Sequence, residues 1–134
     1  MVVAENEIPI NEITGMIVDA AFRVHTTLGP GLLETVYEAA LAHELTKRGL
    51  RVARQVAIPV VYDGILFEVG FRADLVIEDL VIVELKSLEK MSRVHHKQIL
   101  TYIRLADKRV GLLINFGADL IKDGIVRVVN GLEP

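Results

Sequence analysis

Three charged side chains interrupt two apolar runs between Phe71 and Lys86, in the stretch FRADLVIEDLVIVELK. The runs indicate two short buried strands joined by a tight turn. Asp74 stands at the outer end of the first strand, and Glu84 and Lys86 stand at the far end of the second. Because side chains alternate across a strand, Glu84 and Lys86 point to one face and Leu85 points away from it. The pattern therefore predicts an acid and a base held side by side.

The turn between these strands decides which residue faces Asp74. A three-residue turn, Glu78 to Leu80, brings Asp74 level with Glu84, whereas a two-residue turn pairs Asp74 with Val83. We expect an odd loop or a bulge here, because it brings two carboxylates together from adjacent strands.

Two converging carboxylates are suitable ligands for a hard cation such as Mg²⁺ or Mn²⁺, with water completing the shell. A lysine beside them, here Lys86, can orient a cation-bound water and offset charge on an attacked phosphate. The pattern thus indicates a hydrolase site. The alternative is a solvated ion pair between Glu84 and Lys86 at a strand end, with Asp74 in a turn.

Glu34 and Tyr37 follow a Gly-rich loop and share one face at the start of a helix. Such a loop at a helix N-terminus could bind an anion. The alternative is ordinary turn chemistry, in which Glu34 is favourable because of the helix dipole and Tyr37 belongs to the core.

Gln98 and Tyr102 lie one turn apart on a later helix and could contact a phosphate or a base, unless Tyr102 is a core residue and Gln98 a partly exposed spacer. His95 shares their face. The adjacent His96 points about 100° away from His95, so we expect no zinc site at this pair.

The periodicity predicts one domain, residues 1–134, of the α/β or α+β class with one mixed central sheet. We expect helices up to residue 28, over 32–48 and over 92–106, and strands over 52–62, 65–77, 80–86 and 109–115. A last hairpin is expected around Asp123-Gly124, between Leu120-Ile121 and residues 125–129. The predicted order is α-α-β-β-β-α-β-β.

Composition narrows the class of protein. Hydrophobic residues make up 51% of the 134, yet no apolar run reaches the length of a membrane span. Part of this apolar content should therefore lie on the surface, which suggests a homodimer contact. The absence of cysteine excludes disulfides and thiolate metal sites and favours the cytoplasm. A net charge of −3 argues against a protein that coats nucleic acid by bulk charge.

Basic side chains nevertheless gather in one segment. Residues 86–109 contain seven Lys or Arg and two acids, whereas residues 1–45 contain one basic residue and seven acids. Such a strip is compatible with a phosphate backbone entering beside the carboxylates. Arg93 and Lys97, with His95 and Tyr102, are the residues we expect to bind nucleic acid; the alternative is a solvated helix face.

Taken together, GLLETVY, FRADLVIEDLVIVELKS, the helix with Gln98 and Tyr102, and the closing GLLINFG…LIKDGI resemble the small bacterial and archaeal GxxExxY proteins. That family is placed in the PD-(D/E)xK nuclease superfamily, and the likeness extends from about Ile13 to Val129. The resemblance implies a restriction-endonuclease-like core of order α-β-β-β-α-β. Ala73 replaces the proline of the superfamily motif, at a position that carries no ligand.

The resemblance also implies roles for single residues. Asp74 and Glu84 would be metal ligands, the Leu85 carbonyl a third, and Glu34 a supporting carboxylate. Lys86 would be the catalytic lysine. Gln98 would match the polar residue that some superfamily nucleases place on the following helix.

Three functions remain as hypotheses. The first is a Mg²⁺- or Mn²⁺-dependent nuclease or nuclease-like phosphodiesterase. The second is a module or regulatory subunit that binds nucleic acid or a nucleotide without cutting it. The third is a structural oligomer, which predicts neither metal binding nor nucleic-acid affinity.

Overall fold

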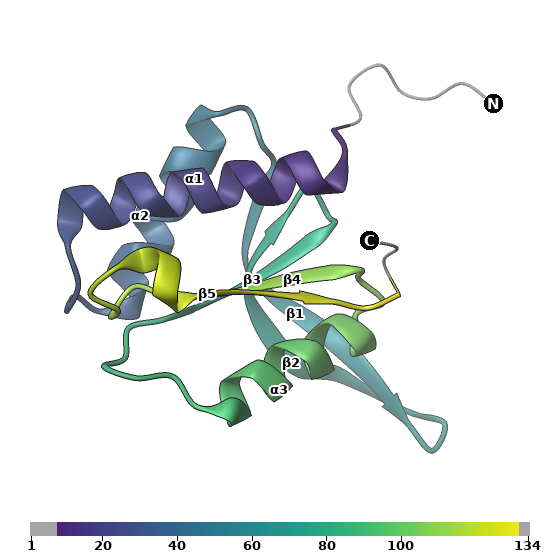
Figure 1. Ribbon diagram of the computed structural model, residues 1–134. Helices are drawn as coiled ribbons and strands as arrows, with labels where there is room; N and C mark the ends of the chain where they lie inside the picture. Colours follow the sequence, from purple (N-terminus) through teal and green to yellow (C-terminus); the bar gives the residue numbers. More distant parts are fainter. Residues whose placement is uncertain (1–7, 132–134) are drawn as a thin grey trace.

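The computed structural model describes residues 8–131, which form three α-helices and five strands around one mixed sheet (Figure 1). In chain order the elements are α1 (Ile10–Leu28), α2 (Glu34–Lys47), β1 (Val52–Tyr62), β2 (Ile65–Ile77), β3 (Val81–Lys86), α3 (Arg93–Leu105), β4 (Val110–Asn115), the 3₁₀ helix η1 (Ile121–Gly124) and β5 (Ile125–Val129). The predicted order α-α-β-β-β-α-β-β and the mixed sheet are confirmed.

The sheet has the order β1-β2-β3-β4-β5, with β3 and β4 parallel and the other neighbours antiparallel. Helices α1 and α2 cover one face and α3 covers the other (Figure 1). β3 and β4 are therefore buried on both faces, as their nearly continuous apolar sequences require. Glu84 of β3 and Asn115 of β4 are the buried polar residues of these two strands, so each needs a reason.

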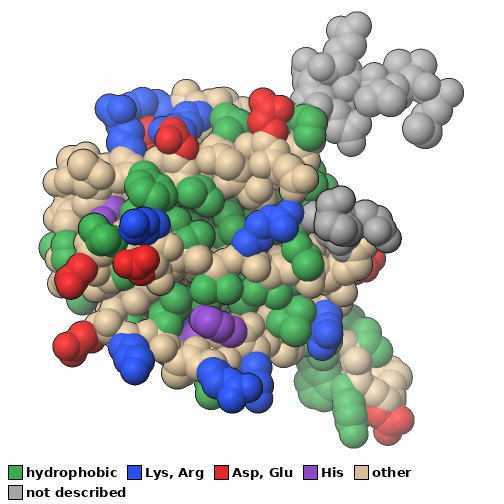
Figure 2. All heavy atoms as spheres, in the orientation of Figure 1, with side chains coloured by type: hydrophobic (Ala, Val, Ile, Leu, Met, Phe, Trp, Pro, Cys, Tyr) green, Lys and Arg blue, Asp and Glu red, His purple; other side chains and the backbone are tan. Residues whose placement is uncertain are grey.

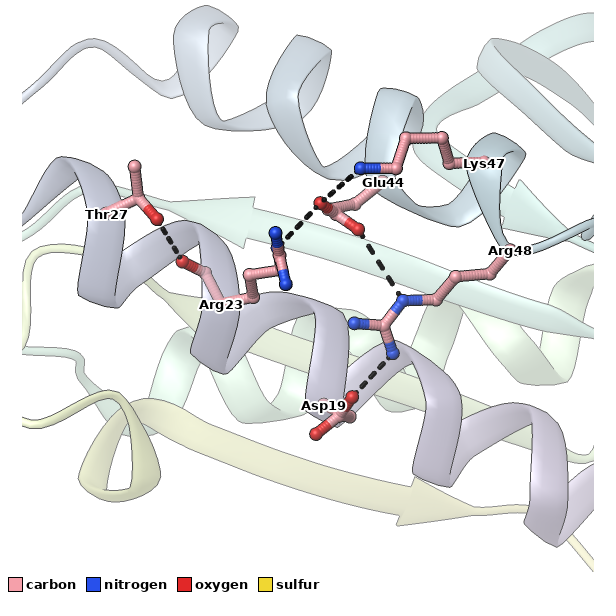
Figure 3. A network of polar contacts seen from close by, with 6 residues as sticks. All are labelled: Asp19, Arg23, Thr27, Glu44, Lys47 and Arg48. Atoms are coloured by element: carbon pink, nitrogen blue, oxygen red, sulfur yellow. Dashed lines mark hydrogen bonds and ion pairs between the residues drawn. The ribbon is translucent and has the colours of Figure 1, made fainter.

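An ion network joins α1 to α2 on the outer side of the helical layer (Figure 3). Glu44 of α2 contacts Arg23 of α1 at 3.1 Å and its own neighbour Lys47 at 3.5 Å. Arg48 bridges Glu44 at 3.6 Å and Asp19 of α1 at 2.6 Å. These partly exposed pairs fix how the helices cross and contribute little net stability each.

The predicted last hairpin is wrong. Residues 121–124 form η1, and β5 pairs with β4 instead of with a strand at Leu120-Ile121. Two apolar residues are too few for a strand, and Ile121 is buried in the core beneath α1 and α2. Gly124 packs so closely on the backbone of Asn115 that an added Cβ would lie 2.5 Å from its carbonyl oxygen.

β1 and β2 extend beyond the sheet as an arm that ends at the Asp63-Gly64 turn (Figure 1). β2 pairs with β3 over Leu75–Ile77 only, so most of its length contacts β1 alone. Apolar side chains gather near the end of the arm (Figure 2), where Val61, Tyr62, Ile65, Leu66, Phe67 and Val69 are all exposed.

In the chain from residue 8 to residue 131, none of the helices combines the length and apolar character that crossing a bilayer demands.

Candidate functional site

The turn after β2 sets the register that the site requires. Leu75 pairs with Val83 and Ile77 with Val81, so three residues form the turn and Asp74 lies opposite Glu84. The predicted three-residue turn is confirmed. Glu78 and Asp79 adopt left-handed backbone angles, φ 53° and 54°, which allow the chain to reverse direction within three residues.

Where β2 separates from β3, the two carboxylates accept backbone hydrogen bonds that carbonyl groups would accept in a continuous pair of strands. The Asp74 N–H donates to Oε1 of Glu84 at 3.2 Å, and the Leu85 N–H donates to Oδ2 of Asp74 at 2.8 Å. Each carboxylate thus accepts a backbone hydrogen bond from the other strand. This reciprocal contact holds the two carboxylates side by side.

Glu84 is 5% exposed, and this burial is the largest cause of a pKa raised to about 9. The charge of Asp74 and a hydrogen bond with its side chain raise the pKa of Glu84 further, while the Asp74 N–H and the charge of Lys86 lower it. At neutral pH Glu84 therefore keeps a proton where no cation is bound. An acid so disfavoured as an anion beside a second acid fits a position that a divalent cation would neutralise.

Lys86 ends β3 two residues after Glu84 and is half-buried. The two share a face of the strand by alternation, as the sequence predicts. The end of β3 is fixed on both sides, because the Lys86 carbonyl accepts the Phe116 N–H at 2.8 Å. An ammonium group is thus presented from a rigid strand end beside the acidic pair.

Asn115 holds the segment that follows Lys86. Its buried side chain accepts the N–H groups of Leu88 and Gly117 at 2.9 and 3.0 Å, and its amide donates to the Leu88 carbonyl at 2.9 Å. The side chain thus makes the hydrogen bonds that a neighbouring strand would otherwise make to this short connection. The chain is therefore pinned immediately after the candidate catalytic lysine.

Glu34 is the first residue of α2 and is exposed. The start of α2 lies beside the end of β3, because the Ser87 hydroxyl donates to the Leu32 carbonyl at 2.6 Å. No hydrogen bond or ion pair joins Glu34 to Asp74 or Glu84, all three of which lie in the described part of the chain. Its role as a supporting carboxylate stays a prediction.

Tyr37 is fully buried and belongs to the core, the alternative that the sequence left open. Its ring stacks on Phe116 with centroids 4.5 Å apart. Its hydroxyl donates to the Gly29 carbonyl at 2.5 Å and accepts the Leu32 N–H at 3.1 Å. Tyr37 thus fixes the loop that leads to Glu34.

α3 brings Tyr102 to the acidic pair. The ring stacks on Phe71 at 4.0 Å, and burial together with the charges of Glu84 and Asp74 raises the pKa of its phenol. A hydrogen bond with Gln98 acts on this pKa in the opposite direction. Tyr102 and Gln98 are therefore half-buried beside the carboxylates and not merely surface residues.

The remaining α3 candidates lie at its first turns. His95 accepts the Ser92 N–H at 3.1 Å through Nδ1 and so caps the helix, which the sequence analysis did not foresee. Arg93 and Lys97 are exposed, and so is His96. Their expected contact with nucleic acid stays a prediction.

Sequence reasoning missed three residues next to the site. Glu38 is 6% exposed on α2, and its carboxylate accepts hydrogen bonds from both Arg54 and Gln55 of β1. Gln55 also donates to Oδ1 of Asp74 at 3.3 Å. One signal was present: Glu38 occupies the apolar stripe of its helix, three residues before buried Leu41.

Asp74 and Glu84 can hold a cation through carboxylate oxygens. Among residues 8–131 no three His, Asp or Glu side chains converge as a ready coordination shell, so water or backbone oxygen would have to complete it.

Comparison with known proteins identifies the family of the chain. No curated protein and no solved structure matches the chain. A family model described as the PD-(D/E)XK nuclease superfamily matches residues 11–128, which include every candidate residue above and all but the first residue of α1 and the last residue of β5. The chain therefore belongs to the PD-(D/E)XK nuclease superfamily.

Proposed function

We propose that this protein is a divalent-cation-dependent nuclease or nuclease-like phosphodiesterase. The observation that carries the proposal is the buried pair of Asp74 and Glu84 with Lys86 beside it. The fold itself does not require an acid between strands that are apolar on both faces, and burial there raises the pKa of Glu84 to about 9.

In this proposal Asp74 and Glu84 hold Mg²⁺ or Mn²⁺, assisted by the Leu85 carbonyl and by Glu34. The bound cation would supply Lewis-acid stabilisation of the phosphate and a lowered pKa for water. Lys86 would orient the attacking water and offset charge that develops on the phosphate. Binding requires Glu84 to lose its proton, because a metal ligand must be deprotonated.

The nucleic-acid substrate would approach from the α3 side of the sheet. Gln98 and Tyr102 lie beside the carboxylates, where an amide and a phenol would contact the phosphate or a base. Arg93 and Lys97 sit on the same helix, where their charges would attract the phosphate backbone, and His95 would contact it through its ring.

A second candidate function is binding without cleavage. Glu38, which shares Gln55 with Asp74, is paired with Arg54 at 2.9 Å, and among residues 8–131 no three His, Asp or Glu side chains converge. A module of this kind would bind nucleic acid through α3 and leave the phosphodiester bond intact.

The test begins with calorimetric titration of Mn²⁺ into the parent protein and into Asp74→Ala and Glu84→Gln. The same samples, with Lys86→Ala, are then incubated with labelled DNA and RNA in Mn²⁺. We expect Mn²⁺ binding to be lost in both acid variants and cleavage to be lost in all three.

Two exposed neighbours serve as matched controls, because Glu89→Gln and Lys90→Ala change the same charges just outside the site. Cleavage by Lys86→Ala at the parent rate would refute the assigned role of the lysine. Mn²⁺ and nucleic-acid binding without cleavage in the parent would favour the second function.

A further inference from the structure

Two consecutive residues of β1 bind the same carboxylate, which an ordinary strand does not allow. Arg54 donates from Nε and a terminal nitrogen to Oε2 of Glu38 at 3.1 and 2.9 Å. Gln55 donates from its amide to Oε1 of Glu38. Neighbouring side chains on a strand point to opposite faces of the sheet, so one of these two residues must have a distorted backbone.

The distortion lies at Gln55, whose φ is +51°. Pairing with β2 continues on either side of it, from Arg54 with Leu75 to Val56 with Ala73, so Gln55 lies opposite Asp74. This left-handed conformation is unfavourable for a glutamine, because its Cβ lies too close to the following carbonyl group.

At the pair formed by Gln55 and Asp74, side chains of both strands switch from one face of the sheet to the other. Leu75 packs in the core cluster beneath α1 and α2, whereas Ala73, two residues away, packs in the cluster beneath α3. Val52 and Val56 of β1 are divided between the two clusters in the same way. The switch turns Gln55 toward α2 while it remains level with Asp74.

The Gln55 amide thereby bridges two acids from different elements. One contact is to Glu38 on α2, and the other is to Oδ1 of Asp74 on β2 at 3.3 Å. The other oxygen of Asp74 already accepts the Leu85 N–H at 2.8 Å. Both oxygens of Asp74 are therefore held, one by β3 and one by a chain of contacts that runs through Gln55 to Glu38 and Arg54.

We propose that Gln55 is a positioning residue for Asp74 and that its left-handed backbone is retained because it aims the amide at that carboxylate. The inference rests on the proposed function, in which Asp74 holds the cation. A neutral amide suits this position: it fixes the carboxylate without adding a positive charge that would compete with the cation. Hydrogen bonds to a ligating carboxylate commonly contribute about 10- to 100-fold in metal affinity.

Two substitutions separate the amide from the backbone. Gln55→Gly removes the amide and relieves the strain, because glycine accepts positive φ freely. Gln55→Met removes the donor but keeps the length of the side chain and the strain. We expect both variants to bind Mn²⁺ about 10- to 100-fold more weakly than the parent in calorimetric titration. Without metal, Gln55→Gly should melt at or above the parent temperature and Gln55→Met should not.

The control is Asp63→Gly at the end of the arm, where another non-glycine residue has a φ of +53°. It relieves the same kind of strain away from the site and should leave Mn²⁺ affinity unchanged. Parent-like Mn²⁺ affinity in Gln55→Gly, or a loss confined to Gln55→Met, would overturn the inference and leave Gln55 as a structural link between α2 and β1. If the parent binds Mn²⁺ no better than Asp74→Ala does, the proposed function itself fails and the inference fails with it.

Discussion

Replacement of Glu84 by glutamine should stabilise the cation-free protein at neutral and alkaline pH. Burial and the charge of Asp74 raise the pKa of Glu84 from 4.5 to about 9. Between these two values the unfolded chain loses the proton and the folded protein keeps it, so the free energy of unfolding falls as pH rises. A glutamine is uncharged throughout and escapes this loss.

The size of the effect depends on how far the pH lies above 4.5, the pKa of Glu84 in the unfolded chain. Each pH unit above 4.5 costs the folded parent about 1.4 kcal/mol until the folded pKa is reached. At pH 7 the predicted advantage of Glu84→Gln is therefore about 3 kcal/mol, or roughly 10 °C in melting temperature for a domain of this size. At pH 5 it should shrink below about 1 kcal/mol.

The assay is urea unfolding of parent and variant at pH 5, 7 and 8.5 in the presence of a chelator. Glu89→Gln is the matched control, since it removes the same charge from an exposed position outside the sheet. A stability gain in Glu84→Gln of the same size at every pH would refute the reasoning, because it would show that ionisation of Glu84 is not what costs stability. Saturating Mn²⁺ should reverse the order of the two proteins, because only the parent is stabilised by binding.

Further predictions concern the proton, the packing and the arm. Mn²⁺ binding at pH 7 should release close to one proton from Glu84, which calorimetry in buffers of different ionisation enthalpy measures; an uptake or release near zero contradicts it. Gly117→Ala should destabilise by about 2 kcal/mol in urea unfolding, because the new Cβ lies 2.3 Å from a backbone oxygen. Gly15→Ala, in open space on α1, should stabilise by about 1 kcal/mol. The apolar arm is where we expect the homodimer contact, so Phe67→Ser should convert a sedimenting dimer to a monomer; a monomeric parent contradicts this expectation.

The central strands could be predicted because their information is local. Alternation places Glu84 and Lys86 on one face, and the length of the turn alone sets Asp74 opposite Glu84. Both follow from counting along sixteen residues. The predicted sheet and element order rest on the same kind of local periodicity.

The environment of Asp74 could not be predicted in this way. Glu38 and Gln55 reach the site through a contact between α2 and β1, and the left-handed backbone of Gln55 has no signature in sequence periodicity. The expected hairpin at Leu120 failed for a related reason, because burial of Ile121 beneath the helices outweighs a turn signal two residues later. Tertiary contacts decided each of these positions.

The amide of Asn115 separates two segments of chain that would otherwise move together. Because it holds the N–H and the carbonyl of Leu88, the exposed residues Glu89 and Lys90 can be exchanged without altering these contacts. This short connection precedes the helix that carries the basic residues, so it is a permissive point for exchange. A library built there would vary the exposed surface before α3 while the Asn115 contacts after Lys86 stay fixed, which makes this small domain a practical starting scaffold for engineering.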